Sequence, residues 1–136
     1  MSKITDSTLA ALTTAANMRH LKQQVISGNI ANAETPGYHA KKMDFEEALA
    51  RAVDLDGLRG MSTSSPEHFA VGGGSMQNVK PDLYDNPVGT VNNDGNTVDL
   101  EREMASLAEN TIMHKAALQL INKKLAALKY AAADGR

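Results

Sequence analysis

The chain has 136 residues, of which 4% are aromatic, and it contains neither tryptophan nor cysteine; its formal net charge is −2. This length is typical of one domain, but short aliphatic side chains bury little area each, which predicts a thin core that partners complete. Without cysteine there are no disulfides, thiol nucleophiles or cysteine-based metal sites, and the charge gives no basic field that would favour nucleic acid.

Residues 5–33 are predicted to form a long helix. Their apolar side chains follow two overlapping runs of three- and four-residue spacing, Leu9, Leu12 and Ala16, then Met18, Leu21 and Val25. A stripe that is this wide predicts that the helix touches more than one neighbour.

A turn should follow this helix directly. Pro36 disfavours helical geometry at Thr35, so the helix should end at or before that residue. Pro36 and Gly37 suit the two central positions of a type II turn. Asn29 and Asn32 lie three residues apart on one helix face near the stop, where they could cap free carbonyls or bond to a neighbouring chain.

The middle of the chain, residues 34–95, lacks sustained periodicity. A short helix is predicted over residues 45–53, with Phe45, Leu49 and Ala52 on one face. The rest has turn and breaker composition, and Asn93-Asp94-Gly95 could close a small hairpin. Because so long a loop is unusual inside a compact domain, we expect residues 57–95 to become ordered only on assembly.

The third region, residues 96–136, is predicted to form a helix from Thr97 to Ala131, about 50 Å long, with Asn96 or Thr97 as its N-cap. A heptad seam runs along it without a break: Leu100, Met104, Leu107, Thr111, His114, Leu118, Ile121, Leu125 and Leu128. Such a seam must be buried against another long helix. The fold class is therefore mainly α, with long N- and C-terminal helices packed as a coiled-coil-like pair and an irregular, loop-rich middle. The segments are 1–33, 34–95 and 96–136.

No catalytic, cofactor-binding or metal-binding residues are predicted. The glycines at 72–74 lack the Gly-Lys-Ser/Thr ending of a phosphate loop, the four histidines are scattered singly, and no nucleophile elbow is present. His114 is interpreted as a polar seam residue that fixes register, or as a pH-sensitive contact. The first 16 residues lack the pattern of a cleavable signal peptide, and no run of about 18 apolar residues predicts a membrane span.

Two motifs carry a resemblance to a known family. The first resembles the N-terminal signature of the flagellar axial proteins, the rod and hook family: Asn29, Ile30, Ala31, Asn32, Ala33, Thr35, Pro36, Gly37 and Tyr38. The second, residues 95–105 with Leu107-Ala108-Glu109-Asn110, is similar to the C-terminal signature of the proteins that build the proximal rod of the flagellar basal body.

This resemblance implies a structural subunit rather than an enzyme. Such subunits assemble helically into the rod, the drive shaft that joins the membrane ring and export gate to the distal rod and hook, and they are needed for flagellum assembly and motility. The implied partners are copies of the chain, other rod proteins, the membrane-ring protein, the rod-base adaptor and the export gate, with no nucleic acid and no membrane span.

The implied location is the periplasmic rod, reached by type III export without a cleavable signal peptide. From the seam itself we expect packing by Leu100, Met104, Leu107, Leu118, Ile121, Leu125 and Leu128. The alternative is a type III-secreted helical adaptor or interaction protein outside the rod, and a small hydrolase that uses the histidines is a distant third.

Overall fold

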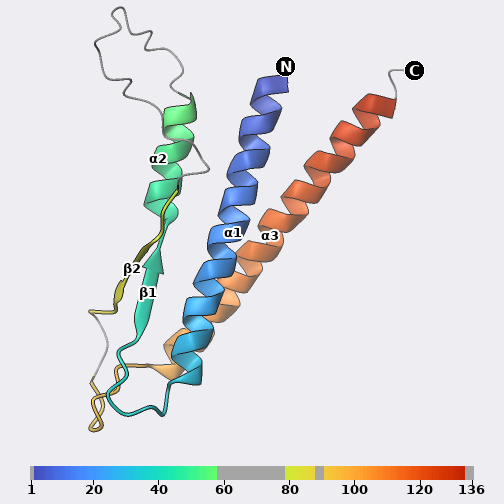
Figure 1. Cartoon of the computed structure of the whole chain (residues 1–136). Helices are drawn as coiled ribbons and strands as arrows, with labels where there is room; N and C mark the ends of the chain where they lie inside the picture. The colour runs from blue at the N-terminus through green and yellow to red at the C-terminus, as the bar shows by residue number, and fades with distance from the viewer. Residues whose placement is uncertain (1, 58–78, 88–90, 134–136) are drawn as a thin grey trace, which may run out of the picture.

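The computed structural model describes residues 2–57, 79–87 and 91–133, and the side chains of these residues except at 2–7 and 54–57. Its elements, in chain order, are α1 (Ser2–Ala31), β1 (Lys41–Asp44), α2 (Glu46–Gly57), β2 (Asp82–Asp85) and α3 (Leu100–Ala133). Helices α1 and α3 run antiparallel; they lie together at one end of the molecule and separate toward the two termini (Figure 1). The predicted fold class, two long paired helices around a loop-rich middle, is confirmed.

The long helices have the predicted positions, with one difference at the start of α3. Helix α1 ends at Ala31, ahead of Thr35 as predicted. Helix α3 begins at Leu100, and its N-cap is Asp99, whose Oδ1 accepts a hydrogen bond of 3.2 Å from the Arg102 N–H. The prediction of Asn96 or Thr97 as the cap was therefore wrong, because Asp99 is also a favourable cap and the earlier side chains bond elsewhere.

The middle of the chain contains a two-stranded antiparallel sheet. Strand β1 pairs with β2 so that Lys41 lies opposite Asp85 and Asp44 opposite Asp82. Ion pairing joins Lys41 to Asp85, and the Tyr84 hydroxyl donates to the Asp44 carboxylate. The sequence had not predicted these strands. The small hairpin that it expected at Asn93-Asp94-Gly95 is represented in the structure by a turn without flanking strands, in which the Asn92 N–H donates to the Asn96 carbonyl at 2.8 Å.

Helix α2 confirms the predicted short helix and packs as expected. Phe45, at its start, and Ala52 are buried, and Leu49 between them is half-buried. With Val79, Ala52 forms a small apolar cluster against α1. Residues 57–95 were expected to become ordered only on assembly. The structure places residues 79–87 and 91–95 of this range in the single chain. The remainder of the range, 58–78 and 88–90, lies outside the described residues.

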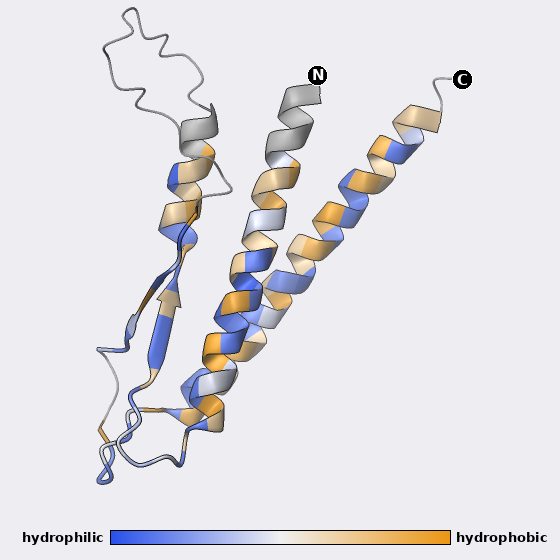
Figure 2. Cartoon of the chain, viewed as in Figure 1, coloured by the Kyte–Doolittle hydropathy of each residue, from blue (hydrophilic) through white to orange (hydrophobic). Residues whose placement is uncertain are grey.

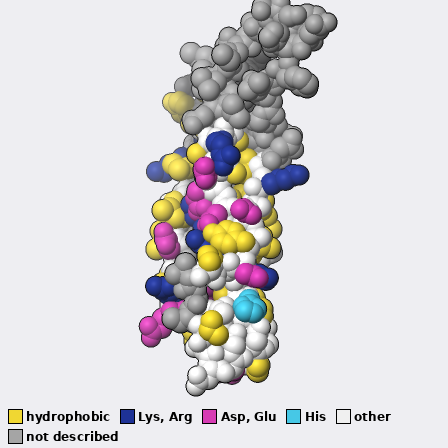
Figure 3. Space-filling model, turned by 90° about the vertical axis from the view of Figure 1, so that its left-hand side faces the viewer, with side chains coloured by type: hydrophobic (Ala, Val, Ile, Leu, Met, Phe, Trp, Pro, Cys, Tyr) yellow, Lys and Arg dark blue, Asp and Glu magenta, His cyan; other side chains and the backbone are white. Residues whose placement is uncertain are grey.

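The core is thin, as the composition predicted. Among the side chains that the structure describes, nine apolar residues are buried and four of them are alanines, Ala16, Ala40, Ala52 and Ala117, while many large apolar side chains on α3 are exposed. Figure 2 shows these apolar positions recurring along the whole of α3. On the face formed by α2 and the sheet, by contrast, Lys/Arg and Asp/Glu side chains are interspersed (Figure 3). Most of the exposed large apolar side chains therefore lie on α3, although Leu83 on β2 and Val53 on α2 are exposed as well.

Candidate functional site

The C-terminal end of α1 is capped by a side-chain hydrogen bond and followed by a tight turn. The Asn32 Nδ2 donates to the Gly28 carbonyl at 2.8 Å, which satisfies one of the carbonyls that a helix end leaves free. The Tyr38 N–H then donates to the Thr35 carbonyl at 3.3 Å across Pro36 and Gly37. Gly37 has a φ of 70°, as the second central position of a type II turn requires.

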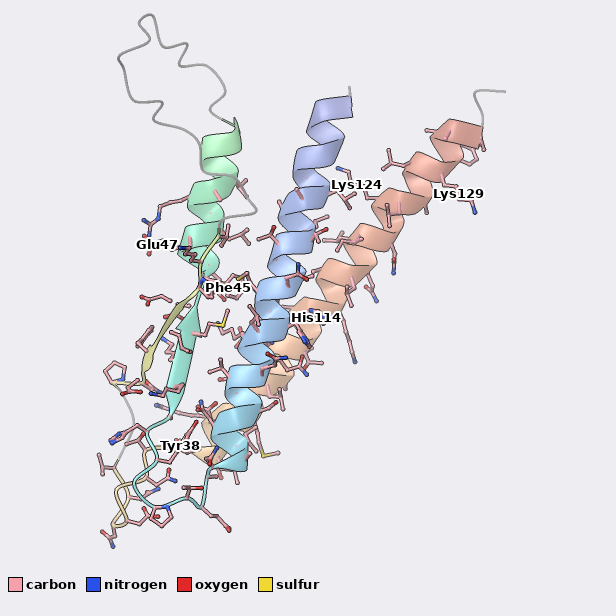
Figure 4. The ribbon with its side chains drawn as sticks, in the orientation of Figure 1. Tyr38, Phe45, Glu47, His114, Lys124 and Lys129 are labelled. Carbon is pink, nitrogen blue, oxygen red and sulfur yellow. The ribbon has the colours of Figure 1, made fainter. Side chains whose placement is uncertain are left out.

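Asn29 joins the end of α1 to strand β1. Its side chain is fully buried; the Nδ2 donates to the Lys41 carbonyl at 2.7 Å, and the Oδ1 accepts from the Lys41 N–H at 2.9 Å. The Tyr38 hydroxyl also donates to this Oδ1, at 3.2 Å. In Figure 4, Tyr38 lies near the lower end of α1. The Asn29 side-chain amide thus makes with the Lys41 backbone the pair of hydrogen bonds that a residue of an adjacent strand would make.

Asn96 joins the same turn to the segment before α3. It is fully buried, and its Nδ2 donates to the carbonyls of Asn32, Ala33 and Thr35 at 2.9, 3.1 and 2.7 Å. Its Oδ1 accepts from the Val98 N–H at 2.7 Å. Sequence reasoning missed this role; the available signal was a polar residue directly after Gly95.

Backbone pairing completes this contact. The Gly37 N–H donates to the Asp94 carbonyl and the Thr97 N–H to the Tyr38 carbonyl, both at 3.0 Å. The Ala40 N–H donates to the Thr97 Oγ1 at 2.9 Å. We call residues 29–40 and 94–97 together the turn node. It holds the end of α1, the start of β1 and the approach to α3 in one hydrogen-bonded unit.

The side of α3 that meets α1 is defined by two buried residues, Asn110 and Ala117. We call the side that includes them the inner face, and its half-buried members are Leu107, His114 and Ile121. Asn110 Nδ2 donates to the backbone carbonyl of Arg19 at 2.8 Å, and Arg19 Nη1 donates to the Asn110 Oδ1 at 3.4 Å.

Two histidines meet beside this contact. The rings of His20 and His114 have centroids 6.4 Å apart, and the His114 Nδ1 is buried without a hydrogen-bond partner. Figure 4 places His114 on α3 beside α1. The contact between the helices is therefore polar at its centre.

The remaining apolar members of the predicted seam are exposed in the single chain. They form what we call the leucine face, with exposed fractions between 41% and 58%: Leu100, Met104, Leu118, Leu125 and Leu128. The predicted seam is thus divided within the chain, because Leu107, Thr111, His114 and Ile121 are half-buried while the leucine face is open to solvent.

A groove of about 590 Å³ lies between α1, β1 and the first turns of α3. Its lining includes both charges, among them Lys22, Arg102 and Glu103. Burial raises the pKa of the Glu103 carboxyl, and a hydrogen bond with Asn29 offsets part of this effect. Burial also acts to raise the pKa of Glu46, but hydrogen bonds from Lys22 and backbone N–H groups outweigh it and leave that pKa below its usual value.

The described residues offer no grouping of three or more side chains suited to hold a metal ion. Within the same part of the chain, none of the helices combines the length and apolar character that crossing a membrane would require. What the arrangement presents is an exposed apolar helix surface and a turn that is held by buried hydrogen bonds.

Comparison with known proteins identifies relatives of this chain. Residues 9–39 match the family model described as flagella basal body rod protein. The flagellar basal body rod protein FlgB of Aeromonas hydrophila is 36% identical over 84% of this chain and 83% of its own length. FlgB of Cereibacter sphaeroides is 39% identical over 82% of both chains, and FlgB of Salmonella typhimurium is 31% identical over 88% of both.

Proposed function

Because this chain belongs to the FlgB family of flagellar basal body rod proteins, we propose that it is a structural subunit of the proximal rod, without enzymatic activity. In this role it assembles helically into the drive shaft that joins the membrane ring and export gate to the distal rod and hook. Flagellum assembly and motility then depend on it.

The observation that carries this proposal is the exposed leucine face of α3. Complete burial of a leucine or methionine side chain stabilises a protein by about 1.5–3 kcal/mol. Five such residues are left 41–58% exposed, so their burial against another subunit would stabilise an assembly substantially. A helix that is apolar on more sides than its own chain covers is typical of a helix that is buried in an assembly.

The proposed contact is between subunits. A surface that packs against a different surface of the next copy repeats without closing, and such repetition generates a helical tube. In this arrangement α1 and α3 form the wall of the tube. Leu107 and Ile121 pack mainly within the subunit, while Leu118, Leu125 and the other members of the leucine face pack on its neighbours.

The turn node has a second role in this proposal. Asn29, Asn32, Pro36 and Gly37 set the direction in which the chain leaves the wall, because their hydrogen bonds and the positive φ of Gly37 fix the path from α1 to β1. The sheet and α2 are then presented at one side of the wall, where the interspersed charges suit contact with water.

The proposed partners follow from the place of the proximal rod. They are further copies of this chain, the other rod proteins, the membrane-ring protein, the rod-base adaptor and the export gate. The proposed location is the periplasmic part of the basal body, which the subunit reaches through the flagellar type III apparatus.

Electron cryotomography of cells that lack this gene tests the proposal. We expect basal bodies with a membrane ring and no rod, and recovery of the rod when the gene is restored on a plasmid. Intact rods and normal swimming in the deleted strain would overturn the proposal. Secretion of the protein without incorporation into purified basal bodies would support an adaptor outside the rod instead.

A further inference from the structure

The centre of the contact between α1 and α3 is a polar residue in a thin apolar surface. Asn110 is only 2% exposed, and both ends of its amide bond to Arg19 on the opposite helix, at 2.8 and 3.4 Å. The shorter bond ends on a backbone carbonyl, so it depends on the position of α1 and not on the identity of residue 19.

The face that α3 turns to α1 is not its most apolar face. The inner face has asparagine, histidine and alanine at its centre, whereas the adjacent side of α3 presents Leu118 in the same region. The row of Leu107, His114 and Ile121 lies between Asn110 and Ala117 on one side and Thr111 and Leu118 on the other. Since successive residues are 100° apart around a helix, a rotation of about 100° would put Thr111 and Leu118 where Asn110 and Ala117 now meet α1.

Apolar burial alone favours that rotation, because Leu118 offers more apolar area to α1 than Ala117 does. The hydrogen bonds of Asn110 oppose it. Rotation would break both bonds to Arg19, and an amide that loses its partners in a largely buried position costs about 1–3 kcal/mol. A polar residue within an otherwise apolar helix contact is known to select one arrangement at some cost in stability.

We propose that Asn110 is a positioning residue that selects which face of α3 packs on α1, and that it thereby keeps the leucine face available to neighbouring subunits. The turn node holds the approach to α3, and among the described residues Asn110 is the next buried polar side chain along that helix. The use of the leucine face by neighbours rests on the proposed function; the choice of face does not.

The test uses the free subunit and two single-cysteine reporters, which are unambiguous because the chain contains no cysteine. Leu118→Cys reports on the leucine face and Ala117→Cys on the inner face. The exposed fractions of the two native residues are 42% and 8%, so a soluble thiol reagent should label the first about five times faster. In the Asn110→Ala background we expect this ratio to fall to about one or below.

Two matched variants separate positioning from general loosening. Thr111→Ala removes a neighbouring hydroxyl that bonds only within α3, to the Leu107 carbonyl, and should leave the ratio near five. Arg19→Ala removes the guanidinium but keeps the carbonyl that accepts the 2.8 Å bond, so its ratio should fall less than that of Asn110→Ala. If Asn110→Ala loses helix content, Asn110→Asp in the Arg19→Ala background takes its place, because an aspartate beside the Arg19 guanidinium would otherwise form an ion pair across the same contact.

A ratio that stays near five in a helical Asn110 variant would overturn the proposal. Assembly in cells is a separate readout. If the ratio falls and rods are also lost, both the choice of face and the use of the leucine face by neighbours are supported. If the ratio falls while rods remain normal, Asn110 still selects the face, and the role given to the leucine face in the rod is wrong.

Discussion

The side-chain amide of Asn96 lies 2.7 Å from the carbonyl oxygen of Thr35, a residue 61 positions earlier in the chain. With the carbonyls of Asn32 and Ala33, this is the third acceptor that one buried side chain serves at the end of α1. The contact joins the first and last segments of the chain at one point, and the energetics of the turn node should therefore depend strongly on it.

Replacement of Asn96 by alanine should lower the free energy of unfolding by about 2–4 kcal/mol, because three carbonyls and the Val98 N–H lose a buried partner. Urea unfolding followed by far-ultraviolet circular dichroism measures this change. Asn93→Ala, at an exposed position of the neighbouring turn, is the control and should have little effect. Equal midpoints for the two variants would show that the Asn96 bonds contribute nothing net.

Gly37→Ala and Gly95→Ala should each destabilise by about 1–2 kcal/mol, because both residues have positive φ, 70° and 79°. Crowding is not the cause: a Cβ on Gly95 would lie 3.5 Å from the Gly37 Cα, an ordinary contact. Gly28→Ala is the matched control. It lies within α1, and an added Cβ would meet only open space there, so this change should stabilise by about 0.5–1 kcal/mol. Thermal unfolding of the three variants compares these signs directly.

Glu103→Gln should stabilise the free subunit at neutral pH and have little effect in acid. The folded-state pKa of Glu103 is raised above its ordinary value of 4.5, chiefly by burial. Its contribution to stability is therefore fully present below that value and is lost as the pH rises through the folded-state pKa. Urea midpoints measured from acid to neutral pH should fall less steeply in the variant than in the native chain. Parallel curves would contradict this assignment.

Leu125→Asp should lower the stability of the free subunit by only about 1–2 kcal/mol, because the side chain is 47% exposed and aspartate is a weaker helix former than leucine, yet it should abolish incorporation into rods. Ile121→Asp, at a half-buried position on the inner face, should prevent assembly and destabilise the subunit more strongly. Gln119→Asp, at an exposed polar position, is the control. Purified basal bodies and unfolding curves provide the two readouts. Normal rods with Leu125→Asp would remove the leucine face from the proposed contact.

Local chemistry was enough to predict much of this structure. The Pro36-Gly37 turn, the end of α1 and the face of α2 that carries Leu49 and Ala52 each depend on residues close together in the chain, and each was predicted. The pairing of β1 with β2 was not, because Lys41–Asp44 and Asp82–Asp85 are short and charged and only their mutual contact makes them strands. Non-local pairing of this kind leaves little trace in either segment alone.

Some features of the candidate site were not predicted because the local sequence does not distinguish between the alternatives. Asn96 has the composition of a helix cap, and nothing local distinguishes it from Asp99, which is the cap in the structure. Likewise the periodicity of α3 indicates a seam but not which of its sides meets α1. That choice involves a polar contact between Asn110 and Arg19, which lie 91 residues apart.

The hydrogen bond between the Ala40 N–H and the Thr97 hydroxyl places the entry and the exit of the middle segment side by side. The segment between Ala40 and Thr97 therefore begins and ends at the same place in the fold. Doubling the length of such a segment costs only about 0.6 kcal/mol in loop-closure entropy. A reporter domain or affinity tag spliced into the span between Ala40 and Thr97 should thus leave the pairing of the long helices intact, so this protein offers a natural site for labelling an assembled structure.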